Sequence, residues 1–237
     1  PQVFMIDGTD VETNSYAAFG QATWNVNDQL AVTVGMRHTR DKKEGLEAIF
    51  APQFFIIDFA TGDALVVEHD ESWDETTGKV GLEYFLADRS LFYSTISTGY
   101  KAGGFNIGGL HEAFDPELVL AYEAGFKTLL ADEQVQLNLS AFLYDYQDLQ
   151  VFQTEESTSV IANAAEATSQ GVELELVAKP MQGLRINAML GWLDATFDKF
   201  DTEDPVQPEL GLQDLSGKHL SRAPEWKFNL GTQYRWS

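Results

Sequence analysis

Cysteine is missing altogether from the 237 residues of the chain. Its absence excludes a disulfide framework, a thiolate metal site and a cysteine nucleophile. Basic residues are scarce: Lys and Arg total 15 against 37 Asp and Glu, and the formal net charge is −22 at pH 7. Because nucleic-acid phosphates require a basic face, this balance argues against nucleic acid as a partner.

Long hydrophobic runs are also missing, because no apolar stretch approaches the roughly 18 residues of a membrane-spanning helix. Apolar material is nevertheless plentiful: 44% of the residues are hydrophobic and 12% are aromatic, too much for a disordered chain. Nothing at Pro1 resembles a signal peptide, and no initiator methionine is present. We therefore expect the chain to begin inside a longer protein.

Apolar and polar residues alternate with a period of two, whereas helical periodicity is nearly absent. Within 135–143 one face collects the apolar residues Val135, Leu137, Leu139, Ala141 and Leu143. The same alternation recurs along the chain and predicts strands at 13–24, 30–42, 73–86, 91–101, 117–130, 135–153, 170–179, 184–199 and 224–236.

The connections between these predicted strands alternate in length. Those at 25–29, 87–90, 131–134 and 180–183 are tight, and those at 43–72, 102–116, 154–169 and 200–223 are long. This alternation is typical of an up-and-down outer-membrane barrel, which has short turns on one side and long loops on the other. The sequence therefore predicts an all-β fold, an antiparallel up-and-down transmembrane β-barrel of which about nine strands are visible.

Aromatic residues gather near the predicted strand ends, where membrane barrels carry interfacial girdles. An alternative is that aromatic residues favour strands wherever they occur. The residues that indicate a girdle are Tyr16, Trp24, Tyr84, Phe85, Tyr144, Tyr146, Trp192, Trp226, Tyr234 and Trp236.

Five segments follow one another in the order of a known set of motifs. They read FYSTISTGYKAGGFN at 92–106, FDPELVLAYEAGFK at 114–127, LYDYQDLQV at 143–151, NAAEATSQGVEL at 163–174 and RAPEWKFNL at 222–230. The ordered set resembles the barrel of TonB-dependent outer-membrane receptors, and residues 16–40 are similar to an earlier hairpin of that family. Each motif is weak by itself, but the resemblance is collinear and covers most of the chain.

The resemblance implies a plugged barrel of about 22 strands in the outer membrane of a Gram-negative bacterium. Such a receptor imports a scarce nutrient, most often a ferric siderophore, with energy from a TonB complex that contacts its N-terminal region. Residues 1–237 would form part of the barrel domain, an internal fragment without the N-terminal plug and the C-terminal strands. The implied partners are the TonB complex, a siderophore or other small nutrient ligand, and outer-membrane lipid or lipopolysaccharide.

Two alternatives stay open beside this interpretation. One is a passive porin or another outer-membrane barrel, an adhesin or secretion barrel, without energy coupling. The other is a soluble all-β binding domain, which the long strands and alternating connections disfavour. The sequence contains no catalytic constellation, so we expect no enzyme activity and no cofactor.

The family motifs have an architectural interpretation. Gly99, Gly103 and Gly104 suit a strand that bends on leaving the membrane, and Pro116 suits a strand start. We expect Tyr122 to face outward. A larger set of polar residues is expected to line the lumen without contacting ligand: Arg37, Glu83, Glu123, Glu173, Arg185 and Lys227.

Metal and ligand contacts cannot be assigned from the sequence. The long connections are acidic, which favours solvated loops, bridged to lipopolysaccharide by divalent ions, over capture of a cationic ligand. The run 201–204 lacks the spacing of a calcium loop. A haem option rests only on His69, His111 and His219 in predicted loops, since His38 lies in a predicted strand. The acidic residues of the predicted long connections are Glu44, Glu47, Asp58, Asp63, Glu68, Asp70, Glu71, Asp201, Glu203, Asp204, Glu209 and Asp214.

Overall fold

The computed structural model describes residues 5–50, 65–87, 89–106, 112–155, 158–204 and 206–236. These residues form an all-β protein, as the alternation predicts. Within the described residues, no helix is long and apolar enough to cross a membrane. The elements are β1 (Met5–Asn25), β2 (Leu30–Phe50), β3 (Leu65–Ala87), β4 (Ser90–Lys101), β5 (Glu117–Leu130), β6 (Val135–Glu155), β7 (Thr158–Met181), β8 (Leu184–Glu203), the 3-10 helix η1 (Pro208–Leu210), β9 (Leu212–Asp214) and β10 (Trp226–Tyr234).

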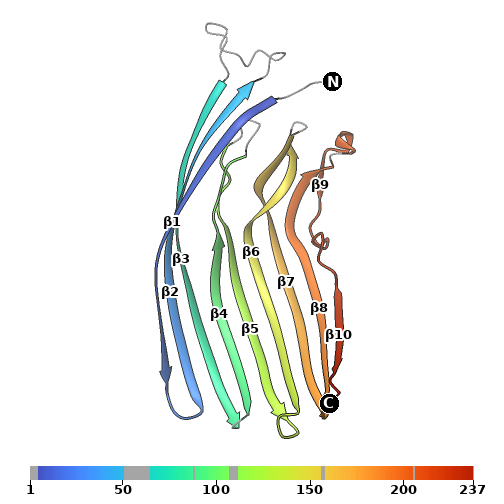
Figure 1. Ribbon diagram of the computed structural model, residues 1–237. Helices are drawn as coiled ribbons and strands as arrows, with labels where there is room; N and C mark the ends of the chain where they lie inside the picture. Colours follow the sequence, from blue (N-terminus) through green and yellow to red (C-terminus); the bar gives the residue numbers. More distant parts are fainter. Residues whose placement is uncertain are drawn as a thin grey trace.

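The strands form one antiparallel sheet in chain order, β1-β2-β3-β4-β5-β6-β7-β8-β10, and the short β9 pairs with β8. Figure 1 shows a single curved layer in which the connections after β1, β3, β5 and β7 lie at one end and those after β2, β4, β6 and β8 lie at the other. We call these the turn end and the loop end. Along this path the sheet stays open, and β1 and β10 form its two edges.

The tight turns have local causes. The Asn27 Oδ1 atom accepts hydrogen bonds from the backbone N–H groups of Gln29 and Leu30, at 2.8 Å and 2.9 Å, and this closes the β1–β2 turn. Residues 131–133 hold positive φ angles in the β5–β6 turn. Gly183 has φ 85° in the β7–β8 turn, and a Cβ there would lie 2.3 Å from the Arg235 carbonyl oxygen.

The predicted long connection at 154–169 is wrong. Strands β6 and β7 continue through it, and Thr154 and Glu155 pair with Ser159 and Thr158. Water can solvate both faces of a hairpin that rises beyond a membrane, so its residues need no contrast between apolar and polar faces. The segment from Thr154 therefore resembles a loop in sequence while it forms paired strands.

The connection at 43–72 is also shorter than predicted, because β2 extends to Phe50 and β3 begins at Leu65. His69 consequently lies in a strand and not in a loop. In the predicted loop 200–223, β8 continues to Glu203, and η1 and β9 follow. The connection at 102–116 is confirmed, since β4 ends at Lys101 and β5 begins at Glu117.

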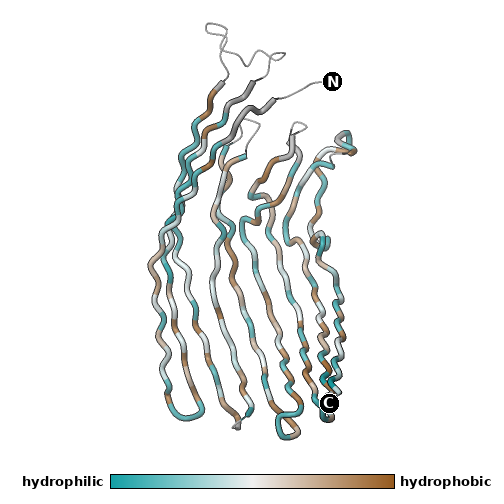
Figure 2. The backbone as a smooth tube through the Cα atoms, in the orientation of Figure 1, coloured by the Kyte–Doolittle hydropathy of each residue, from teal (hydrophilic) through white to brown (hydrophobic). Residues whose placement is uncertain are grey.

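Directly opposed residues share a face of the sheet, so the register assigns the faces. One continuous row across nine strands is Trp24, Val32, Leu82, Ser94, Ala124, Ala141, Val172, Trp192 and Trp226. We call its side the apolar face. A row on the opposite side, the polar face, is Asn25, Ala31, Glu83, Tyr93, Gly125, Ser140, Glu173, Gly191 and Lys227. Figure 2 shows this alternation of hydropathy along the strands.

The sheet encloses little core of its own. Its accessible surface is 15951 Å². A compact globule of 26.4 kDa would expose about 10,600 Å². Among the residues whose burial is described, the buried apolar side chains are few and mostly small: Ala31, Val160, Ala165, Ala167, Ala195 and Phe200. The wall therefore buries little apolar surface by itself, and its exposed apolar side chains need contacts outside the described residues.

Candidate functional site

The apolar face carries a band of large side chains that begins at the turn end. On β2 it consists of Leu30, Val32, Val34 and Met36, of which Val34 and Met36 are 54% and 66% exposed. The next residues on this face of β2 are His38, Arg40 and Lys42, so the band stops after Met36. On β8 the apolar positions of this face run from Leu184 to Trp192, and about 9–11 residues cross a bilayer on a tilted strand.

Aromatic side chains mark both limits of this band. Trp24, Tyr84 and Tyr234 lie toward the turn end, and Trp192 opposes Trp226 toward the loop end. Three residues predicted for the girdle do not belong to it. The register places Phe85, Tyr144 and Tyr146 on the polar face. Period-two alternation puts adjacent residues on opposite faces, so closeness to a strand end is insufficient to assign a girdle residue.

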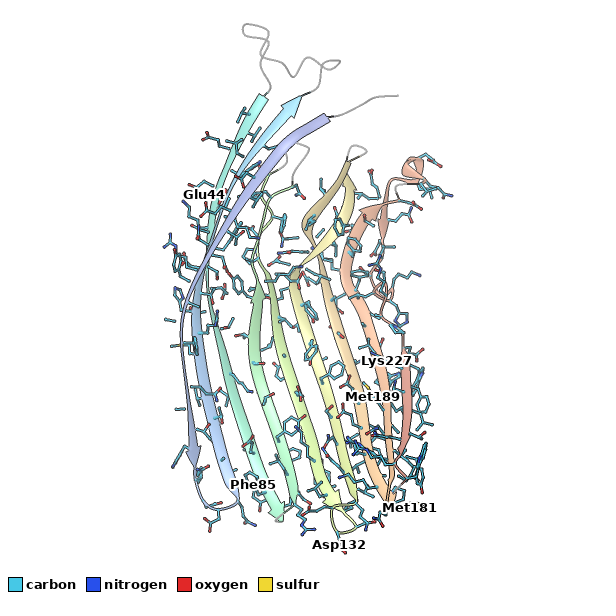
Figure 3. The ribbon with its side chains drawn as sticks, viewed as in Figure 1. Glu44, Phe85, Asp132, Met181, Met189 and Lys227 are labelled. Carbon is cyan, nitrogen blue, oxygen red and sulfur yellow. The ribbon has the colours of Figure 1, made fainter. Side chains whose placement is uncertain are left out.

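The polar face holds all six residues that the sequence assigns to a lumen wall. Arg37, Glu83, Glu123, Glu173, Arg185 and Lys227 share this side of the sheet. Tyr122 lies on the opposite face, as predicted. In Figure 3, Lys227 on β10 lies at mid-height of the wall, with Phe85, Asp132 and Met181 near the turn end.

The centre of the polar face is a network around Tyr93. Its hydroxyl donates a 2.6 Å hydrogen bond to Glu123 Oε1, and the Lys127 ammonium lies 5.1 Å from the ring centroid. Gly125 opposes Tyr93, and a Cβ at Gly125 would lie 2.4 Å from the ring. The glycine therefore leaves space for the aromatic ring to lie across the neighbouring strand.

A similar pair occurs one hairpin further on. Gly171 opposes Phe142, and a Cβ at Gly171 would lie 2.6 Å from the Phe142 ring and 2.5 Å from the Trp192 carbonyl oxygen. The Phe142 ring also stacks on Tyr144, with centroids 4.9 Å apart. The glycine of the SQGVE motif thus serves close packing on the wall, in agreement with an architectural interpretation of the motif.

At the loop end, the connection after β4 is held against β2 and β3. Lys43 Nζ donates a 2.6 Å hydrogen bond to the Gly103 carbonyl and lies 5.8 Å from the Trp73 ring centroid. Phe105 stacks on His69, with centroids 4.7 Å apart. His69 Nε2 in turn lies 3.4 Å from an oxygen of Glu47, which is only 1% exposed.

The same connection is held on its other side by β6 and β7. Asn106 exchanges two hydrogen bonds with the backbone of Ile161, and Asn163 exchanges two with the backbone of Asp115. Gln150 Nε2 donates to the carbonyls of Ala102 and Asp115, at 3.1 Å and 3.0 Å. Side-chain amides therefore provide the donors and acceptors that an irregular backbone lacks.

The connection 102–106 and 112–116 thus ties the β2–β3 arm to the β6–β7 arm, and we call it the tie. Four of the family-like motifs converge on it. These motifs are recognisable in the sequence, but Lys43, His69 and the amides are not predicted from it as contacts of the tie. The Asn and Gln side chains inside the motifs are a usable signal, because such amides often replace backbone partners.

The acidic residues of the predicted loops are dispersed over strands and loops. Glu44 and Glu47 lie in β2, and Glu68, Asp70 and Glu71 lie in β3. Asp201 and Glu203 lie in β8, and Asp214 ends β9. The predicted positions Asp58, Asp63 and His111 lie outside the described residues. Across the described part of the chain, no group of three or more His, Asp or Glu side chains is placed to hold a metal.

Two of the ionisable groups at the loop end have shifted pKa values. Lys42 donates a 2.6 Å hydrogen bond to Glu44 and lies 3.2 Å from Asp70, and the bond to Glu44 chiefly raises the pKa of Lys42. Asp214 accepts a 2.8 Å hydrogen bond from the backbone of Ser216. Hydrogen bonds from the Ser216 side chain and backbone lower the pKa of Asp214.

Comparisons with known proteins place this wall in a family. Residues 5–237 match the family described as TonB dependent receptor-like, beta-barrel. The pesticin receptor of Yersinia pestis is 28% identical over 163 residues, which cover 67% of this chain and 23% of that protein. The metal-pseudopaline receptor CntO of Pseudomonas aeruginosa is 28% identical over 124 residues, 52% of this chain and 17% of that receptor.

A solved structure shows the same fold. The ferric yersiniabactin uptake receptor FyuA from Yersinia pestis superposes with a TM-score of 0.74 at 21% identity, covering 94% of this chain and 32% of that one. The chain therefore spans less than a third of the length of these relatives. The match over nearly all of its residues, together with the two-faced wall, shows that the chain belongs to the TonB-dependent receptor β-barrel family of Gram-negative outer membranes.

Proposed function

We propose that the chain is part of the barrel wall of a receptor that imports a metal chelate with energy from a TonB complex. The proposed chelate is a ferric siderophore. The family match over residues 5–237 carries the proposal. One curated relative supports a metal-chelate cargo, since it is described as a metal-pseudopaline receptor. The solved relative is described as a ferric yersiniabactin uptake receptor.

In this proposal each face of the wall has one role. The apolar face contacts outer-membrane lipid, because its exposed valine, methionine and aromatic side chains are stable only out of water. The polar face contacts the plug of the longer protein and the cargo that passes it. The acidic residues beyond the band, including Glu44 and Asp70, meet lipopolysaccharide through divalent ions.

The tie contributes a rigid rim in this proposal. Because it connects two arms through motif residues, it positions the loop end relative to the lumen without contacting cargo itself. The residues that bind cargo would lie on loops and on the plug, where the wall provides only the frame.

A transport assay on the complete receptor tests this proposal. Cells that carry the receptor gene are grown without iron, and accumulation of radiolabelled ferric chelates is measured with and without an intact TonB complex. We expect accumulation that needs both the receptor and TonB. Accumulation that persists without TonB would instead indicate a passive barrel, and accumulation of none of the ferric, cupric or zinc chelates would refute a metal-chelate cargo.

A further inference from the structure

The polar face is not uniform in charge. Strands β5 to β7 present the carboxylates of Glu123, Glu173 and Glu175 on this face. Strands β2 and β3 present Arg37 and Lys79 on adjacent register rows of the same face, with Glu83 of β3 two rows closer to the turn end. In a chain with a net charge of −22, two neighbouring cations make this part of the wall an exception.

These two cations line a hollow of about 320 Å³. Gly35 lies directly opposite Lys79 and Arg37 lies directly opposite Thr77, so the cations lie diagonally across two paired strands. Gly35 has no side chain to fill the space between them. The polar-face residues that line the hollow are Phe19, Gln21, Gly35, Arg37, Thr77, Lys79 and Ser97.

Neither cation is neutralised within the described residues. The Arg37 guanidinium lies 5.7 Å from the Phe19 ring centroid, and its Nε donates a 2.9 Å hydrogen bond to Thr39. No acidic side chain of the described chain lies within ion-pair distance of Arg37 or Lys79. Glu75, on the same face of β3, accepts a hydrogen bond from the Thr76 backbone instead.

We propose that this hollow is a binding subsite for a carboxylate group of the molecule that crosses the barrel. Two neighbouring cations that line one hollow attract an anion. An Arg guanidinium binds carboxylate through paired N–H donors, with a Lys ammonium and the Thr77 and Ser97 hydroxyls to complete the set. This inference rests on the proposed transport function and adds to it the charge of the cargo and the strands that the cargo touches.

This chain contains no cysteine, so one introduced thiol is a unique label within it. The reactivity of that thiol with charged reagents measures the local charge without knowledge of the cargo. A Gly35→Cys substitution places a thiol in the hollow, where the atoms nearest to a Cβ belong to the Gln21 side chain, at 3.6 Å. The complete receptor, free of other cysteines, is treated with an anionic ethylsulfonate or a cationic trimethylammonium methanethiosulfonate. Diagonal neighbours across paired strands are about 7 Å apart. For two cations at this spacing and physiological salt, we expect the anionic reagent to react about fivefold faster.

Two matched variants control this measurement. Adding Arg37→Gln and Lys79→Gln to Gly35→Cys should abolish the preference for the anionic reagent. A Gly191→Cys variant places the thiol on the same face between Glu173 and Lys227, where a Cβ meets nothing nearer than 3.9 Å. Because those two charges oppose each other, this thiol should show little preference.

Citrate, as the carboxylate probe, should slow the labelling of Cys at position 35 at least twofold relative to sodium chloride of equal ionic strength. Equal rates for the two reagents, or no protection by citrate, would overturn the subsite. A thiol at position 35 that reacts with neither reagent until the receptor is unfolded would show that a protein segment fills the hollow, and would also overturn it. TonB-dependent uptake is measured separately in the Arg37→Gln, Lys79→Gln receptor, so that intact uptake with a failed subsite leaves the transport function standing.

Discussion

Asn106 and Ile161 exchange two hydrogen bonds, at 2.8 Å and 2.7 Å, across 55 residues of sequence. The amide of Asn106 has the same donor and acceptor arrangement as a peptide group, so it continues the pairing of β7 where no further strand is available. The interaction joins the tie to the β6–β7 arm. It explains why an asparagine ends the YKAGGFN motif.

Replacing Asn106 by alanine should loosen the tie. The substitution leaves the backbone N–H and carbonyl of Ile161 without these partners, at a cost of about 1–3 kcal/mol. Hydrogen exchange of the complete receptor in detergent should become faster in residues 102–106 and 158–163. Asn229→Ala on β10 is the control, and unchanged exchange in Asn106→Ala would contradict the assignment of the tie.

Gly171 and Gly191 provide a matched pair of wall glycines. Gly171→Ala should destabilise the barrel by about 1–3 kcal/mol, because its Cβ would collide with the Trp192 carbonyl and the Phe142 ring. Gly191→Ala meets nothing nearer than 3.9 Å and should be neutral or slightly stabilising. Urea unfolding of the refolded receptor in detergent compares the two, and equal midpoints would show that Gly171 has no packing role.

Leu230 and Asn229 test the assignment of the two faces. Leu230 lies on the apolar face of β10 and is 59% exposed, whereas Asn229 is its neighbour on the polar face. Leu230→Arg should destabilise the folded barrel in lipid by about 2–4 kcal/mol, because the charge would face hydrocarbon. Asn229→Arg should have little effect. The measurement is unfolding in phospholipid vesicles, and the opposite order of effects would mean that the faces are exchanged.

Asp214 gives a prediction on pH. Its ordinary pKa is 3.8, and the hydrogen bonds from Ser216 lower it in the folded state. The stabilisation of the β9 turn by the carboxylate is therefore complete above pH 3.8 and is lost as the pH falls through the lower folded pKa. Carbon-13 NMR of labelled aspartate, assigned with Asp214→Asn, should show a carboxyl that titrates below 3.8, and Ser216→Ala should shift it upward.

The sequence predicts the β-sheet architecture well where one face must meet lipid. The strand 117–130 and the connection 131–134 agree with the structure residue for residue, because a turn limits the pattern there. The pattern fails at 154–169, where paired strands continue into water and alternation no longer separates apolar from polar residues. The same alternation predicts the faces of Tyr122 and Glu123 correctly, because this strand has one face toward lipid.

The candidate site is less accessible to sequence analysis. The motifs around Asn106 and Asn163 are visible, but the contacts of Asn106 with Ile161 and of Asn163 with Asp115 depend on a tie between distant arms. The hollow beside Gly35 likewise requires the register of β2 and β3. Spacing along one strand predicts which face a residue occupies, whereas neighbours across strands come only from the three-dimensional structure.

Each long strand pairs only with its neighbours in chain order, except that β8 pairs with both β10 and the short β9. A whole hairpin can therefore be gained or lost in evolution while every remaining strand keeps the same side toward lipid. An insertion of one residue inside a strand has the opposite effect, since it exchanges the two sides from that point onward. The circumference of such a wall consequently changes in steps of two strands, and duplication of a hairpin is the simplest genetic route to a wider barrel.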